Sequence, residues 1–317
     1  MDTIELVDPE LRELLHTRPK LRLNNEVLPK SRAFITKAAE AQAKPDLADL
    51  SVTEIWVQSA FDAPAIRVLS YKPASAQTPL PAILHAHAGG FVMGAPEMTD
   101  VEHRLLAQEL QCAIFSVDYR LAPESPYPAA MQDVYSVLLW LHENADTLGL
   151  DRERIGIKGE SGGGGVAAAV ALYTRDHNGP KLAFQHLIYP MIDDRTAVRS
   201  DLPAHAGEFF WTQEHNLFAW SALLGTTPGA DDVSPYAAAA RAKDLSGIPP
   251  TYLSVGDLDL FCEENIDFAG RLARAGIPVE LHVYPGAYHG FRAVAHARVS
   301  QQADRDSREA LRRSLHG

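Results

Sequence analysis

The sequence contains little cysteine and no excess of basic residues. Its 317 residues include two cysteines, Cys112 and Cys262, each in a largely apolar stretch. This usage favours buried free thiols over a disulfide framework. Lysine and arginine number 29 against 41 aspartates and glutamates, which gives a net charge of −12. Because phosphate binding needs a cationic face, this balance argues against a nucleic-acid partner and against an anionic membrane surface.

Long apolar runs, repeats and low-complexity tracts are also missing. Residues 1–5 are acidic and lack the apolar core of a signal peptide. Nowhere does the apolar character extend over the roughly 20 residues that cross a bilayer. We therefore expect a soluble, cytoplasmic protein without stable membrane association.

Short apolar segments alternate with helical ones from residue 81 onwards, which is the pattern of a parallel sheet covered by helices on both faces. Two earlier segments, 54–58 and 66–70, are typical of paired strands joined by a turn. The expected strands of the alternating part are 82–86, 113–117, 154–158, 184–189, 251–255 and 279–284, and the expected helices are 101–110, 129–144, 163–177 and 263–275. The fold class is therefore α/β.

Two regions depart from this alternation. The first 50 residues have a helical pattern, with Asp8-Pro9 at one helix start and a second helix over 31–42. About sixty residues separate the strands that end at 189 and begin at 251, and connections this long are often lids. We predict a helical cap made of residues 1–50 and 191–235 over a catalytic core of 51–190 and 236–317. The last helix is expected over 293–315.

A serine between glycines gives the clearest chemical signal. Residues 159–163 read Gly-Glu-Ser-Gly-Gly between a predicted strand and a predicted helix. A sharp turn there would expose the Ser161 hydroxyl and free the Gly162 N–H to bind an oxyanion, while small neighbours avoid collisions. The same five residues could form a simple turn without chemistry, so the rest of the chain must decide.

A nucleophilic serine needs a base, and the base needs an orienting carboxylate. Asp259 follows the strand predicted at 251–255, and His289 follows the strand at 279–284. Carboxyl ends of parallel strands meet at one edge of a sheet, so both should approach Ser161 in the chain order of an α/β hydrolase. Asp257 competes with Asp259 for the acid role, and we favour Asp259.

The loop after strand 82–86 supplies the third feature. Gly89 and Gly90 could point two backbone N–H groups at a reacting oxygen and, with Gly162, form a three-donor oxyanion hole. His87 is interpreted as a residue that braces this loop. His85 and His87 have the spacing of a metal pair, but no third ligand is well placed, and we expect no metal.

Together these segments resemble the bacterial hormone-sensitive lipase-like esterases, also called family IV. The matching segments are His87-Ala88-Gly89-Gly90 for the family's His-Gly-Gly-Gly, residues 159–163 for its Gly-Asp-Ser-Ala-Gly, residues 118–129 for a characteristic family stretch, and Asp259 and His289 for its acid and base. The resemblance covers about residues 55–291. It implies an α/β-hydrolase core, a two-part cap, and cofactor-free hydrolysis of short- to medium-chain carboxylic esters.

The chain departs from the family pattern at four positions. Ala88 replaces the first glycine, and Leu260 stands where proline is common. Glu160 replaces aspartate, and this longer side chain is expected to affect the bracing of the His87 loop. Gly162 replaces alanine and gives four consecutive glycines at a helix start. Each glycine within a helix costs about 1 kcal/mol relative to alanine, and a close approach of backbone or substrate would explain it.

We therefore expect a serine carboxylesterase with a Ser161–His289–Asp259 triad and an acyl-enzyme intermediate. Phe91, Phe209, Phe210 and Trp211 are candidates for its substrate pocket. The only partner expected besides a small ester is a second copy, paired through the edge strand 279–284. Two other functions stay open: an amide, lactone or carbamate hydrolase on the same core, and a ligand receptor without turnover.

Overall fold

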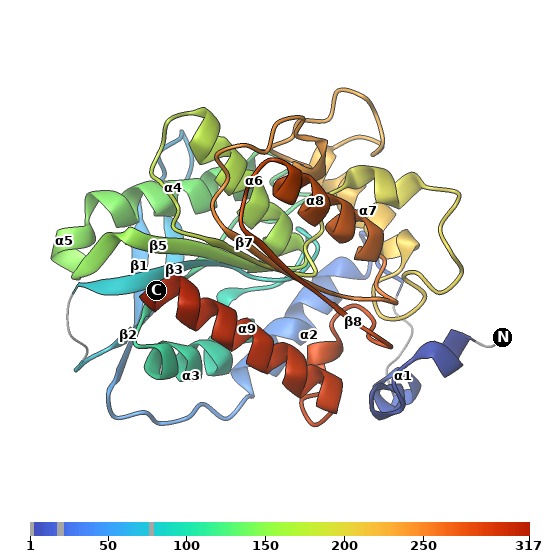
Figure 1. Ribbon diagram of the computed structural model, residues 1–317, viewed down its shortest axis with the longest axis horizontal. Coiled ribbons are helices and arrows are strands. Elements are labelled where there is room, and N and C mark those ends of the chain that lie inside the picture. The colour runs from blue at the N-terminus through green and yellow to red at the C-terminus, as the bar shows by residue number, and fades with distance from the viewer. Residues whose placement is uncertain (1–2, 18–21, 76–78) are drawn as a thin grey trace.

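A single mixed sheet organises the chain (Figure 1). The computed structural model describes residues 3–17, 22–75 and 79–317. Within these residues, eight strands follow the order β1-β2-β4-β3-β5-β6-β7-β8. The strands are β1 (Leu50–Val57), β2 (Ile66–Pro73), β3 (Leu80–Ala86), β4 (Ala113–Asp118), β5 (Leu150–Glu160), β6 (Gln185–Ile188), β7 (Thr251–Gly256) and β8 (Val279–Tyr284). β1 pairs antiparallel with β2, and β2 pairs antiparallel with β4. The pairs from β4 to β8 are parallel, so their carboxyl ends meet at one edge.

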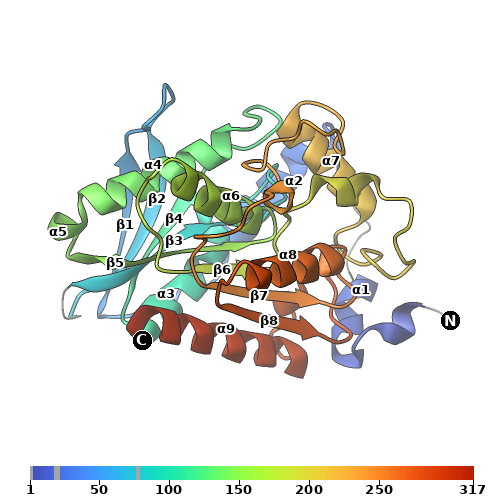
Figure 2. The ribbon, with the colours of Figure 1, turned by 45° about the horizontal axis from the view of Figure 1, so that its top comes forward.

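Helices cover both faces of this sheet, as Figures 1 and 2 show. One face carries α3 (Asp100–Leu110) and α9 (Arg298–His316), and the other carries α4 (Ala129–Glu143), α6 (Gly162–Asp176) and α8 (Cys262–Arg274). This double cover explains why all seven residues of β3 are buried, since a strand covered on both faces is largely apolar; His85 is its one polar residue. The short helix α5 (Ala145–Leu148) leads into β5.

The remaining helices gather beyond the carboxyl ends of the strands (Figure 2). They are α1 (Arg12–Thr17), α2 (Leu28–Glu40) and α7 (Gln213–Leu224). Short 3-10 helices complete the described chain: η1 (Thr3–Leu6), η2 (Pro9–Leu11), η3 (Pro96–Thr99), η4 (Asp194–Val198), η5 (Ala239–Arg241) and η6 (Phe291–Ala293). The division into a core and a two-part cap stays a prediction.

The predicted α/β class is confirmed, and each predicted strand segment forms a strand of the sheet. Asp8 caps the first turn, since its side chain accepts a hydrogen bond from the Glu10 N–H at 2.8 Å. Two helix starts were wrong. The second helix begins at Leu28 rather than 31, with Pro29 in its first turn. The last begins at Arg298 rather than 293, because Gly290 (φ 75°) reverses the chain and η6 intervenes.

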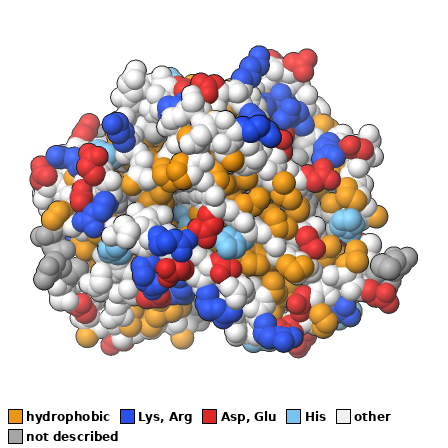
Figure 3. All heavy atoms as spheres, viewed as in Figure 1, with side chains coloured by type: hydrophobic (Ala, Val, Ile, Leu, Met, Phe, Trp, Pro, Cys, Tyr) orange, Lys and Arg blue, Asp and Glu red, His pale blue; other side chains and the backbone are white. Residues whose placement is uncertain are grey.

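The surface carries charges of both signs interspersed with apolar groups on the face shown in Figure 3. Among the described residues, no helix is long and apolar enough to cross a membrane.

Several histidines are buried within this architecture. Burial lowers the pKa of His87 to about 4 and holds the pKa of His103 and of His186 well below the usual histidine range. His186 stacks on Tyr252 and makes a 2.9 Å hydrogen bond through Nε2 to the Ser307 hydroxyl. These imidazoles therefore stay neutral in the folded chain at pH values where the unfolded chain protonates them.

We predict that this difference makes the unfolding free energy fall as the pH drops from 7 towards 5. The unfolded chain takes up protons below about pH 6.5, and the folded chain does not, which disfavours folding by about 1.4 kcal/mol per pH unit for each such histidine. Replacing His186 by glutamine should reduce the loss between pH 7 and 5 by about 2 kcal/mol, measured by urea unfolding. The buried Glu264, whose raised pKa acts in the opposite direction, is common to both proteins and cancels. Equal losses in the two proteins would contradict the prediction.

Candidate active site

Ser161 occupies the tight turn between β5 and α6. Its backbone angles are φ 54° and ψ −122°, a conformation that residues other than glycine adopt only under strain. The turn also requires its flanking glycines. A Cβ on Gly159 would lie 2.3 Å from the Gly163 carbonyl oxygen, and one on Gly163 would lie 2.2 Å from that of Ala86. The strained strand-to-helix turn predicted from the sequence is confirmed.

Three side chains from distant parts of the chain form a hydrogen-bonded series at this turn. The Ser161 hydroxyl lies 2.9 Å from His289 Nε2. On the other side of the ring, His289 Nδ1 donates to Asp259 Oδ2 at 2.8 Å. The Phe261 N–H binds the second carboxylate oxygen of Asp259 at 3.0 Å, and Asp259 is fully buried. This carboxylate therefore holds one tautomer of the imidazole, with the Nε2 lone pair facing the serine.

Asp257, the competing acid, has different surroundings. Its Oδ1 atom is buried without a hydrogen-bond partner in the described structure. Burial raises the pKa of its carboxyl group. Its N–H bonds to the Tyr284 carbonyl oxygen at 3.1 Å. The geometry thus brings Asp259, and not Asp257, into hydrogen-bond contact with His289.

The glycine loop after β3 approaches Ser161 closely. Gly89 and Gly90 have φ values of 140° and 58°, and the following Phe91 has a φ of 67°. A Cβ on Gly162 would lie 2.7 Å from the Phe91 nitrogen and 2.8 Å from the Gly90 nitrogen. The N–H groups of this loop therefore lie beside the start of α6. The close backbone approach expected as the reason for glycine at position 162 is confirmed.

His87 and Tyr119 support the same loop from behind. The Tyr119 hydroxyl donates to the His87 carbonyl oxygen at 2.7 Å, and the two rings stack with centroids 4.2 Å apart. His87 Nδ1 lies 2.9 Å from the carbonyl oxygen of Ala88. A Cβ on Gly94 would lie 2.5 Å from this Nδ1 atom, so the loop is closely packed around the ring.

A buried polar network lies beneath the serine. The Glu160 carboxylate binds His85 Nε2 at 2.7 Å and forms an ion pair with Lys158. His85 Nδ1 in turn lies 2.8 Å from the Ser116 hydroxyl. Although burial alone would raise the pKa of Glu160, the nearby Lys158 ammonium and His85 hold it well below its usual range. The network joins the strand that ends at the glycine loop to the strand that ends at Ser161.

This network defines the contacts of the Glu160 side chain. We expected its extra length to affect the bracing of the His87 loop. Its hydrogen bonds reach His85, on the strand that leads into that loop, and Lys158 on its own strand. Sequence reasoning did not single out Lys158. The signal was an apolar strand interrupted by one lysine two residues before an acid, since such a pair lies on one face of a strand.

Among the three aromatic candidates outside the loop, Phe209, Phe210 and Trp211, it is Trp211 that lies against the glycine loop. A Cβ on Gly90 would lie 2.3 Å from the Trp211 ring, and the ring centroid is 6.1 Å from that of His289. Phe209 and Phe210 instead pack against Tyr288, with ring centroids 6.3 and 6.2 Å away. The structure therefore places one of these three rings directly over the loop.

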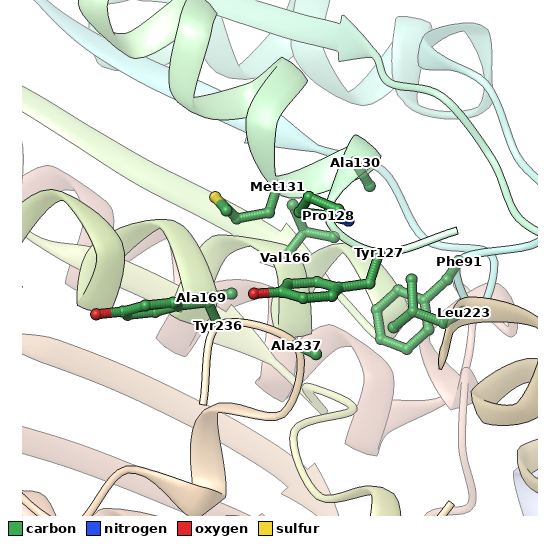
Figure 4. Close-up of a pocket in the computed structure, with 10 residues that line it drawn as sticks. All are labelled: Phe91, Tyr127, Pro128, Ala130, Met131, Val166, Ala169, Leu223, Tyr236 and Ala237. Carbon is green, nitrogen blue, oxygen red and sulfur yellow. The ribbon is translucent and has the colours of Figure 1, made fainter. Parts of the chain in front are cut away.

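Phe91 faces away from the loop, toward an apolar cavity between α4, α6 and α7. Its ring lies 5.1 Å from that of Trp220. The cavity, shown in Figure 4, has a volume of about 10 Å³, which is room for one water molecule. Its lining residues are Phe91, Tyr127, Pro128, Ala130, Met131, Val166, Ala169, Leu223, Tyr236 and Ala237. Ser161 is not among them, so this cavity lies behind the reacting groups.

Comparison with known proteins agrees with this geometry. The family model described as alpha/beta hydrolase fold matches residues 83–293. Esterase LipI of Mycobacterium tuberculosis is 32% identical, with 98% of this chain and 96% of the relative covered. Carboxylesterase NlhH of the same species is 33% identical, with 98% and 97% covered. The solved structure titled "Bacterial Heroin Esterase" superposes with a TM-score of 0.92 at 37% identity, covering 99% of this chain and all of that one. The chain therefore belongs to the α/β-hydrolase fold family, in its group of bacterial hormone-sensitive lipase-like esterases.

Proposed function

We propose that this protein is a serine carboxylesterase that hydrolyses small carboxylic esters through an acyl-enzyme intermediate. One observation carries the proposal: the unbroken hydrogen-bonded series from Ser161 through His289 to Asp259 at a strained turn. Relatives named as esterases, aligned over nearly their whole length, support it.

In the proposed reaction, His289 Nε2 takes the proton of the Ser161 hydroxyl while the oxygen attacks the ester carbonyl carbon. The Gly89, Gly90 and Gly162 N–H groups bind the negative carbonyl oxygen that forms. Asp259 stabilises the imidazolium. The ester C–O bond then breaks, and the alcohol leaves with the proton from His289. Water, deprotonated by the same imidazole, attacks the acyl-serine carbon. The bond to the Ser161 oxygen then breaks, His289 returns the proton to that oxygen, and the acid is released.

We propose that the acyl group is small, because the space near the glycine loop is already filled. The Trp211 ring packs directly on Gly90. The similarity to a heroin esterase supports an ester of a bulky alcohol with a short acid. No cofactor takes part in this mechanism.

Two further proposals concern the state of the protein in the cell. We propose a homodimer through β8, which lies at the end of the sheet and carries the exposed Val283, and a cytoplasmic location. Size-exclusion chromatography of the purified chain tests the first of these, since a monomer would contradict it.

Replacing Ser161 by alanine should abolish hydrolysis of a short aryl ester, because no other hydroxyl lies in this series. We expect kcat to fall about 10⁴-fold or more, while the circular dichroism spectrum stays unchanged. A fluorophosphonate probe should label the wild type and not the variant. Matched aryl amides, lactones and carbamates should turn over more slowly than the ester. Full ester turnover by a pure variant would contradict the nucleophile assignment.

Replacing Gly162 by alanine should weaken the oxyanion hole, because the new methyl group would push on the Gly90 and Phe91 nitrogens. We expect kcat/KM to fall by about 10²-fold or more, as with loss of one donor. Gly270 is the control, since it is also helical and a Cβ there would meet only the tip of Arg274 at 3.8 Å. Its alanine variant should keep full activity and gain about 1 kcal/mol of stability. Equal activities of the two variants would refute the predicted clash.

Replacing Trp211 by alanine should enlarge the space beside Gly90 and favour longer acyl chains. We expect kcat/KM for an octanoyl ester to rise about 10-fold relative to that for the acetyl ester. Phe209→Ala is the control, because this ring packs on Tyr288 and should leave the ratio unchanged. An unchanged ratio in the Trp211 variant would show that the ring does not limit chain length.

A further inference from the structure

Helix α2 is joined to the glycine loop by one arginine, although sixty residues separate them in sequence. Arg32 Nε donates to the Val92 carbonyl oxygen at 2.7 Å. Its Nη2 donates to the Ala122 carbonyl oxygen at 2.8 Å. The two terminal nitrogens also bind both carboxylate oxygens of Glu124, each at 2.8 Å. One planar guanidinium thus holds three chain segments in a fixed geometry.

Two of these contacts bear directly on the oxyanion hole. Val92 follows Gly90 by two residues in the same loop. Ala122 belongs to the neighbouring loop after β4, and its N–H donates to the Phe91 carbonyl oxygen at 3.0 Å. Val92 and Ala122 are almost fully buried, and a buried carbonyl that loses its donor destabilises the arrangement around it. Removing the guanidinium would therefore loosen the loop on both sides of Phe91.

The loop needs such support because its backbone is unfavourable. Gly90 and Phe91 both have positive φ values, 58° and 67°, and the latter is a bulky residue for which this region is strained. Without restraint, Phe91 would relax toward negative φ and turn the neighbouring N–H groups. Arg32 opposes this relaxation at Val92, while Ala122 opposes it at Phe91.

We propose that Arg32 is a positioning residue for the oxyanion hole, so that docking of α2 assembles the hole. The inference rests on the proposed esterase function. In this arrangement, α2 does more than cover the site, because separating the helix from the core removes the guanidinium from the loop. Substrate access and transition-state stabilisation are thereby coupled through one side chain.

A purely structural role for Arg32 would give a different result. The α2 helix also buries Leu28, Ser31 and Ala39, and these contacts remain when the arginine is replaced. A variant that merely loosens the helix would change the thermal midpoint and leave the kinetic constants of the folded enzyme intact. A positioning role lowers kcat in the folded enzyme with KM nearly constant, since the oxyanion forms after binding.

The test uses Arg32→Ala and Arg32→Lys with a short aryl ester, and Lys37→Ala, an exposed position on the same helix, as the control. We expect kcat to fall 10- to 100-fold in the alanine variant, with KM within about twofold. Arg32→Lys should restore little of this kcat, because an ammonium group lacks the planar, paired N–H donors of a guanidinium. Millimolar guanidinium chloride should raise kcat of the alanine variant several-fold and leave wild type and Lys37→Ala unchanged.

The outcomes separate this inference from the proposed function. A wild type without ester turnover or fluorophosphonate labelling would contradict the function itself. An active wild type with unchanged kcat in Arg32→Ala would overturn the positioning role. Should the alanine variant fail to fold, Arg32→Lys decides: at least a fivefold lower kcat at constant KM supports the proposal, and a smaller loss overturns it.

Discussion

The close approach of two backbone segments at the carboxyl ends of β3 and β5 is the constraint on which the rest of the site depends. No side chain fits between the start of α6 and the glycine loop, since a Cβ on Gly162 or Gly163 would meet backbone atoms at 2.2–2.8 Å. This contact fixes where the hydroxyl of Ser161 and the N–H groups of the loop lie relative to each other. Catalysis of acyl transfer requires that relation before substrate arrives, because donors that must reorganise lose much of their electrostatic benefit.

Side chains behind this contact keep it in place from three directions. Tyr119, which follows β4, supports the loop through its contacts with His87. The pair formed by His85 and Glu160 joins β3 to β5, and Arg32 approaches from helix α2. Each of these groups is at least partly buried, so each hydrogen bond is protected from competition with water. The strain stored at Ser161 and Phe91 is thus balanced by contacts outside the turn itself.

The sequence allowed prediction of the fold and of the hydrogen-bonded series, because both follow from local patterns. Alternating apolar strands and helices place strand ends at one edge, and this rule brought Ser161, Asp259 and His289 together without coordinates. The rule of strand ends alone did not distinguish Asp257 from Asp259, which we favoured, since both residues follow the same strand. Only the turn at Asp259–Phe261 aims one carboxylate at the imidazole. The contacts of Arg32 were missed because they join segments 60 to 92 residues apart in the chain, and no spacing rule reports such contacts. The Lys158–Glu160 pair is different, because the two residues lie on one face of a strand, and that signal was present in the sequence but not used.

The ion pair beneath the serine has a consequence for how relatives of this chain can vary. The extra methylene of Glu160, compared with aspartate, lets one carboxylate reach both Lys158 and His85. Without that acid, the buried lysine would keep only the more distant Glu102 carboxylate, 3.7 Å away, and proteins tolerate a weakly paired buried charge poorly. Positions 85, 158 and 160 should therefore change together during evolution, so that a homologue with the shorter acid carries a different, uncharged residue in place of the lysine.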